Sequence, residues 1–134
     1  MVIKRFRRVM VGRVRPHPQP GARARLVLPP LPARLAEQLK DYPLHVEQLQ
    51  LALQGVAMAR GTRLPRIEMA LWVLEDRVGR FLAEARRELD AARCSGNVER
   101  FAAAQKMEKV MFTLRLRHQW LRDEVFVGYF RDLR

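Results

Sequence analysis

The sequence is poor in small polar residues. Among its 134 residues, Ser95 is the only serine, Asn97 is the only asparagine, and Thr62 and Thr113 are the only threonines. Few side chains are therefore left to cap helices, to form turns or to act as hydroxyl nucleophiles. Ser95 has no histidine or aspartate neighbour at a recognised catalytic spacing, so catalysis by a serine nucleophile is not indicated.

Cysteine is also scarce, because Cys94 is the only one. A single cysteine excludes an intrachain disulfide and any metal site that needs several cysteines. The HExxH and CxxC motifs are missing, and no glutamate is followed by a histidine three residues later, as in di-iron bundles. We therefore expect no catalytic residue, no metal site, no cofactor and a protein that is not an enzyme.

Long apolar runs are missing too. No stretch approaches the roughly 18 consecutive apolar residues of a transmembrane helix. The runs Val9–Val11 and Leu26–Leu28 are shorter than the apolar core of a secretory signal, which has about 7–15 residues. A mitochondrial presequence would be rich in serine, and none precedes Ser95. We therefore expect an intracellular, cytoplasmic protein.

Acidic residues are absent from the first part of the chain, where Glu37 is the first. Residues 1–34 hold nine basic residues, whereas residues 35–134 hold seventeen basic and fourteen acidic ones, so the first segment supplies +9 of the net charge of +12. Such an asymmetry points to a polyanionic partner. Arginine outnumbers lysine 22 to 4, which suits phosphate binding but is also the composition that a GC-rich genome produces.

Residues 1–32 are expected to form an extended basic arm, because Pro16, Pro18 and Pro20 disfavour helix. The arm's cations could bind phosphates, and Phe6 could stack on a base. A short basic amphipathic helix that lies on a membrane surface is a further alternative for the start of this segment.

A second basic group lies late in the chain around Arg117, His118 and Trp120. Arg115 and Arg122 are seven residues apart, so on one helix they would share a face and extend the basic surface. The predicted nucleic-acid-binding residues are Lys4, Arg5, Phe6, Arg7, Arg8, Arg13, Arg15, Arg23, Arg25, Arg115 and Arg122.

Beyond the arm, apolar residues recur at alternating intervals of three and four, the heptad pattern of packed helices. We expect Pro43 to break or restart the first helix, and Gly96 and Asn97 to form a turn in which Asn97 caps the next helix. The predicted helices span residues 33–41, 43–59, 65–93 and 98–126. Their seams are Leu35, Leu39, Tyr42, Val46, Leu49, Leu53 and Val56; Ile67, Leu71, Leu74, Val78, Phe81, Ala85, Leu89 and Ala92; and Phe101, Ala104, Met107, Met111, Leu114, His118, Leu121 and Val125.

These patterns predict an all-α fold: a long antiparallel helical hairpin within a three-helix bundle whose first helix is broken, preceded by the extended basic arm. The arm spans residues 1–32, the bundle residues 33–127 and a C-terminal tail residues 128–134. The tail carries Tyr129 and Phe130 beside Phe126, and we expect it to cover one end of the bundle or to contact a partner.

Two functional interpretations stay open. The first is a non-enzymatic nucleic-acid-associated protein, a small accessory or structural subunit of a nucleoprotein assembly whose arm binds the phosphates of DNA or RNA. An acidic protein surface is the alternative partner of the arm. The second is a helical interaction or regulatory module that forms a homodimer or pairs with partner helices through its seams. Exposed apolar residues beside the seams would favour this second interpretation, and the candidates are Trp72, Leu82, Val110 and Trp120.

Overall fold

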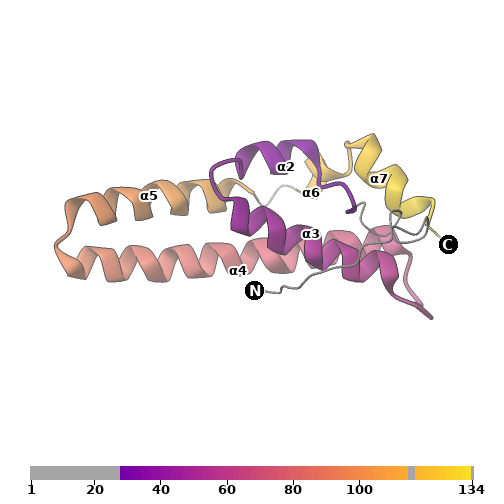
Figure 1. Cartoon of the computed structure of the whole chain (residues 1–134), viewed down its shortest axis with the longest axis horizontal. Coiled ribbons are helices and arrows are strands. Elements are labelled where there is room, and N and C mark those ends of the chain that lie inside the picture. Colours follow the sequence, from indigo (N-terminus) through magenta and orange to yellow (C-terminus); the bar gives the residue numbers. More distant parts are fainter. Residues whose placement is uncertain (1–27, 115–116, 134) are drawn as a thin grey trace, which may run out of the picture.

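The computed structural model describes residues 28–114 and 117–133, and within these ranges every regular element is an α-helix, which confirms the all-α prediction there. The central helix is α4: helices α3, α5 and α7 pack against it, and α2 packs against α6. In Figure 1, α4 and α5 run side by side as a hairpin whose turn projects beyond α2 and α3. In chain order the helices are α2 (Ala33–Gln38), α3 (Pro43–Met58), α4 (Arg66–Ser95), α5 (Val98–Thr113), α6 (Arg117–Trp120) and α7 (Glu124–Arg131).

The predicted basic arm lies outside the described residues up to position 27. Its last five residues, 28–32, are described and have no regular secondary structure. Pro29 and Pro32 are buried, whereas Leu28 is 39% exposed. The arm therefore joins the helical bundle through two buried prolines just before α2.

The first predicted helix is divided at Pro43, as the sequence indicated. Pro43 is the first residue of α3, a position where a missing backbone N–H leaves no helical hydrogen bond unmade. The heptad phase continues across the break, because Leu35 and Leu39 before it and Leu49 and Leu53 after it are all fully buried. Helices α2 and α3 therefore contribute to the same hydrophobic core.

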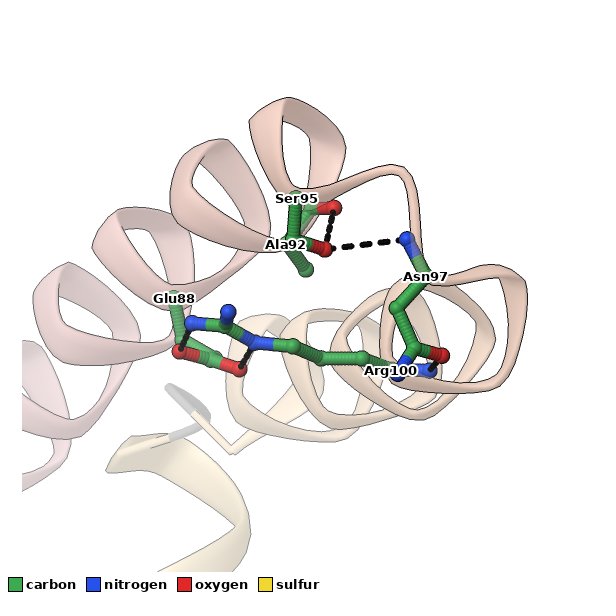
Figure 2. A network of polar contacts seen from close by, with 5 residues as sticks. All are labelled: Glu88, Ala92, Ser95, Asn97 and Arg100. Carbon is green, nitrogen blue, oxygen red and sulfur yellow. Dashed lines mark hydrogen bonds and ion pairs between the residues drawn. The ribbon is translucent and has the colours of Figure 1, made fainter.

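The turn between α4 and α5 uses the only serine and the only asparagine of the chain (Figure 2). Gly96 adopts a left-handed conformation with φ of +73°, which favours glycine. The Ser95 hydroxyl donates to the Ala92 carbonyl at 2.7 Å and accepts from the Asn97 N–H at 3.1 Å. The Asn97 side chain accepts from the Arg100 N–H at 3.0 Å, so the predicted N-cap is confirmed.

The single helix predicted over residues 98–126 is wrong. Helix α5 ends at Thr113, and α6 and α7 follow as separate helices. The predicted seam fails beyond Leu114, because His118, Leu121 and Val125 are exposed. Leu121 is 47% exposed and Val125 is 72% exposed, which is incompatible with positions in a packed seam.

Burial of aromatic rings explains why the helix does not continue. Trp120, Phe126 and Phe130 are 2%, 0% and 1% exposed, and the helix predicted over residues 98–126 would have placed Trp120 and Phe126 away from its seam. Fully burying a phenylalanine contributes about 1.5–3 kcal/mol, so burying three aromatics outweighs a few helical hydrogen bonds. Helix α7 spans the boundary at residue 128 between the predicted bundle and the predicted tail, and it packs against α4.

One carboxylate links the start of the bundle to its end. Asp123 Oδ1 accepts a hydrogen bond from the Phe126 N–H at 3.0 Å and so caps α7. Asp123 Oδ2 accepts from the N–H of Ala33, the first residue of α2, at 2.7 Å. Asp123 therefore satisfies backbone donors at the first turns of two helices that are far apart in the sequence.

Candidate interaction surface

Most residues predicted to bind nucleic acid lie outside the described ranges. The structure describes Arg122, whose side chain is exposed in the turn between α6 and α7. Arg122 follows α6 and not α5, so the single helix on which it was expected to share a face with Arg115 does not extend to Arg122. The residues outside the described ranges are Lys4, Arg5, Phe6, Arg7, Arg8, Arg13, Arg15, Arg23, Arg25 and Arg115.

The neighbours of Arg122 take part in the fold. Arg117 donates to Glu68 at 3.1 Å and to Glu75 at 3.4 Å, and both carboxylates belong to α4. The Trp120 ring lies in the core and is therefore not free to stack on a base. Arg117 is thus attached to α4 by ion pairs. Trp120, the aromatic residue of the predicted second basic group, is buried in the core.

The charges of the hairpin are largely balanced. Arg100 donates two hydrogen bonds to Glu88, at 2.9 and 3.0 Å, and these bonds hold the pKa of Glu88 below its usual value (Figure 2). Arg86 meets Glu108 at 3.5 Å across the two helices. The described ranges contain sixteen basic and fourteen acidic residues, a net charge of +2. The remaining +10 of the net +12 belongs to residues outside those ranges.

Helix α3 carries apolar side chains on two opposite sides. At 100° per residue, its exposed and its buried apolar residues point in nearly opposite directions. The exposed residues are spaced by seven: Leu44, Leu51 and Met58, which are 69%, 58% and 64% exposed. Together with Gln48 and Gly55, which lie between them, they form what we call the outer stripe. The buried residues, in contact with the core, are Leu49, Leu53 and Val56.

The composition of α3 makes this exposure unusual. Glu47 is its only acidic residue and it has no lysine or arginine, whereas α5, also of sixteen residues, has five charged side chains. A helix that is apolar on all sides is normally buried on all sides. Within the described ranges, however, α3 packs mainly against α4 and keeps its outer stripe exposed.

Nothing in the described fold requires a glycine at position 55 of the outer stripe. Its φ is not positive, and a Cβ added there would meet no atom within 4 Å. Glycine in a helix interior costs about 0.5–1 kcal/mol relative to alanine. What glycine provides at this position is a low point between Leu51 and Met58, which a side chain of another helix could fill.

The opposite side of α3 is held firmly, so the outer stripe is presented on a fixed support. Arg66 donates from Nε to the Val56 carbonyl at 3.3 Å and from Nη2 to the Ala59 carbonyl, which ties the end of α3 to the start of α4. Near the other end of α3, His45 packs edge-on against Phe81, with ring centroids 4.4 Å apart. Both ends of α3 are therefore attached to α4.

The sequence interpretation placed the buried histidine wrongly. His118, expected on the seam of the third helix, is exposed, whereas His45, outside any predicted seam, is half-buried. Burial lowers the pKa of His45, and the nearby Glu84 carboxylate partly opposes that effect. His45 is therefore neutral in the folded protein at pH values where an unfolded chain already begins to bind protons.

We expect His45 to make the fold less stable in mild acid. The unfolded chain takes up a proton near the ordinary pKa of 6.5 and the folded protein only at lower pH, so the free energy of unfolding falls as the pH drops through this interval. His45→Gln should remove this contribution. Urea unfolding of both proteins between pH 7.5 and about pH 5 measures it. Stability profiles that stay parallel over the whole range would contradict the prediction.

Other exposed apolar residues are less suited to pairing with a helix. Trp72 is 71% exposed, as predicted, but the prediction is wrong for Leu82 and Trp120, which are buried, and Val110 is partly buried. Phe112 is 61% exposed, but it borders a groove lined by charged residues of α4 and α5. Sequence reasoning missed the outer stripe, although its spacing of seven and the scarcity of charge in α3 were visible signals.

The described ranges offer little for chemistry. They contain no group of three or more His, Cys, Asp or Glu side chains that could hold a metal ion. Cys94 is exposed beside the hairpin turn. No helix in the part of the chain that the structure describes is both long and apolar enough to cross a membrane. The outer stripe is therefore the strongest candidate site on this surface.

Comparisons with protein-family models, with curated protein sequences and with solved structures gave no match to this chain. No function or site residue can therefore be transferred from a relative. The role of the outer stripe has to be inferred from its own chemistry.

Proposed function

We propose that this chain is a non-enzymatic helical protein–protein interaction module that binds through the outer stripe of α3. The observation that carries the proposal is the exposure of Leu44, Leu51 and Met58 in heptad spacing on a helix with one acidic residue and no lysine or arginine. Apolar side chains aligned in this way lower their free energy when a second helix removes them from water.

The fixed attachment of α3 supports the same proposal. Arg66 and His45 hold the two ends of α3 on α4, so little conformational entropy has to be lost when a partner binds the outer stripe. An amphipathic helix laid along such a surface is a common mode of recognition.

Site-specific photocrosslinking in cells tests the proposal. A photoreactive amino acid at position 51 should give a discrete intermolecular adduct. The same amino acid at position 83, an exposed alanine on α4, is the matched control and should give none. If position 51 gives no intermolecular adduct, the proposed function is wrong.

A second candidate function is nucleic-acid association through the basic arm, and the charge distribution favours it. The described helices are nearly neutral, and eight basic residues with no acidic residue lie in positions 1–27. Arginine and lysine on a segment of that kind would neutralise phosphates and release counterions, and the partner could also be an acidic protein surface.

The salt dependence of binding tests this second function. If about six phosphates are neutralised, the logarithm of the binding constant for duplex DNA should fall against log salt with a slope near −5. Deletion of residues 1–27 should abolish the binding while the helical circular dichroism signal remains. Binding that does not depend on salt, or that survives the deletion, would contradict this function.

A further inference from the structure

We infer that the partner of the outer stripe is a second copy of this chain, paired antiparallel through α3. This inference rests on the proposed function and adds the identity of the partner to it. The juxtaposition that carries it is Leu44, Leu51 and Met58 alternating with Gln48 and Gly55 along one exposed side of the helix.

The spacing of the outer stripe is that of a coiled-coil seam. Its five residues are separated by 4, 3, 4 and 3 positions, so the three apolar ones occupy every d position and Gln48 and Gly55 occupy the a positions. Residues in this arrangement form knobs that insert between four residues of a facing helix. The surface is therefore shaped for another helix with a seam, and α3 itself is such a helix.

Charge makes a second copy an acceptable partner despite the net +12 of the chain. In coiled coils, charges at the e and g positions select partners. Here those positions hold His45 and Ala52 on one side and Glu47 and Gln54 on the other. Burial lowers the pKa of His45, so this side chain is neutral at pH 7. In a symmetric pair, whether parallel or antiparallel, no two like charges then face each other at the e and g positions.

Gly55 favours the antiparallel orientation. In a parallel pair the a positions face each other, so Gly55 would face its own copy and leave a void between the helices. In an antiparallel pair, a positions face d positions, so a leucine of the partner fills the space above Gly55. The same symmetry places each Gln48 opposite an apolar side chain of the partner.

The length of α3 sets the expected affinity. Sixteen residues span about 24 Å, which provides few seam layers on each side. Such an interface falls below the area of stable permanent dimers, so the pair should be reversible and should form at high micromolar concentration.

Sedimentation of the purified full chain tests the inference. Between about 10 µM and about 1 mM, the average mass should rise toward twice that of one chain. Leu51→Glu should raise the dissociation constant about tenfold or more, because it places two carboxylates near the symmetry axis. Ala83→Glu changes the charge equally on the exposed side of α4 and should leave the dissociation constant unchanged. Circular dichroism of both variants verifies that they fold.

A cysteine at position 51 gives an independent measurement. In a Cys94→Ser background, a short bifunctional thiol cross-linker should join Leu51→Cys into a covalent dimer, and it should not join Ala83→Cys. Spin labels at position 44 then report orientation: an antiparallel pair separates them by about 15 Å or more, because they lie near opposite ends of the paired helices. Labels about 10 Å apart or closer would overturn the antiparallel arrangement.

The two proposals fail in different ways. A full chain that stays monomeric at about 1 mM overturns self-pairing, whatever happens in cells. A photoadduct from position 51 with a protein of another mass then leaves the interaction function intact. A cross-link from position 51 to residues 1–27 of the same chain, with no intermolecular adduct, overturns both proposals.

Discussion

Replacing Phe126 by alanine is expected to lower the free energy of unfolding by about 3–5 kcal/mol. The side chain is fully buried, and its ring meets Phe130 edge-on with centroids 5.4 Å apart. Alanine would leave a cavity between α7 and α4 and would remove the aromatic contact. Urea unfolding followed by circular dichroism measures the change.

The neighbouring residue provides the matched control. Val125 is 72% exposed, so Val125→Ala should change the free energy of unfolding by less than about 0.5 kcal/mol. If the third helix were continuous, Val125→Ala would cost more stability than Phe126→Ala, because the seam of that helix includes Val125 and not Phe126. A larger loss from Val125→Ala than from Phe126→Ala would therefore contradict the packing of α7.

Removing the Asp123 carboxylate is expected to cost about 2 kcal/mol, toward the upper end of what a helix cap contributes. The reason is that Asp123→Ala leaves two backbone donors without partners, the N–H of Phe126 in α7 and the N–H of Ala33 in α2. Because both N–H groups lie in the first turns of helices, the negative charge of the carboxylate is also lost where it interacts favourably with the helix dipoles.

Asp132→Ala is the control for the lost charge, because Asp132 is an exposed residue just after α7. It should change the free energy of unfolding by less than about 0.5 kcal/mol. Hydrogen exchange should locate the effect of Asp123→Ala in the first turns of α2 and α7. Equal losses of stability in the two variants would mean that net charge, not capping, accounts for the change.

Short-range signals in the sequence predicted their structures well. Pro43 starts α3, Gly96 adopts positive φ and Asn97 caps α5, and each outcome depends on the chemistry of a few adjacent residues. The heptad repeat likewise predicted the buried sides of α2, α3 and most of α4, because periodic burial follows directly from the helical repeat.

Long-range packing decided what the sequence alone left open. The predicted seam of the third helix continues through His118 and Val125. Burying Trp120, Phe126 and Phe130 nevertheless lowers the free energy of the folded protein by more than continuing the helix would. No local sequence pattern predicts the end of α5, because it depends on how α7 packs against the surface of α4. The half-burial of His45 against Phe81 has the same origin.

The outer stripe of α3 was not predicted from the sequence, for a related reason. Helix α3 has two apolar sides, and the heptad seam predicted from the sequence follows the side that packs in the core, which leaves out Leu44, Leu51 and Met58. Sequence patterns show that both sides are apolar, but only the packed structure shows which of them stays in contact with water.

By itself, the sequence determined the helical class, the break at Pro43, the turn at Gly96 and Asn97, and the concentration of positive charge near its start, since these follow from local backbone chemistry and composition. Only the tertiary structure decided where α5 stops, which histidine is half-buried and which side of α3 remains exposed. Those outcomes depend on contacts between residues that are distant in the chain, and the free energy of such contacts cannot be read from neighbouring residues.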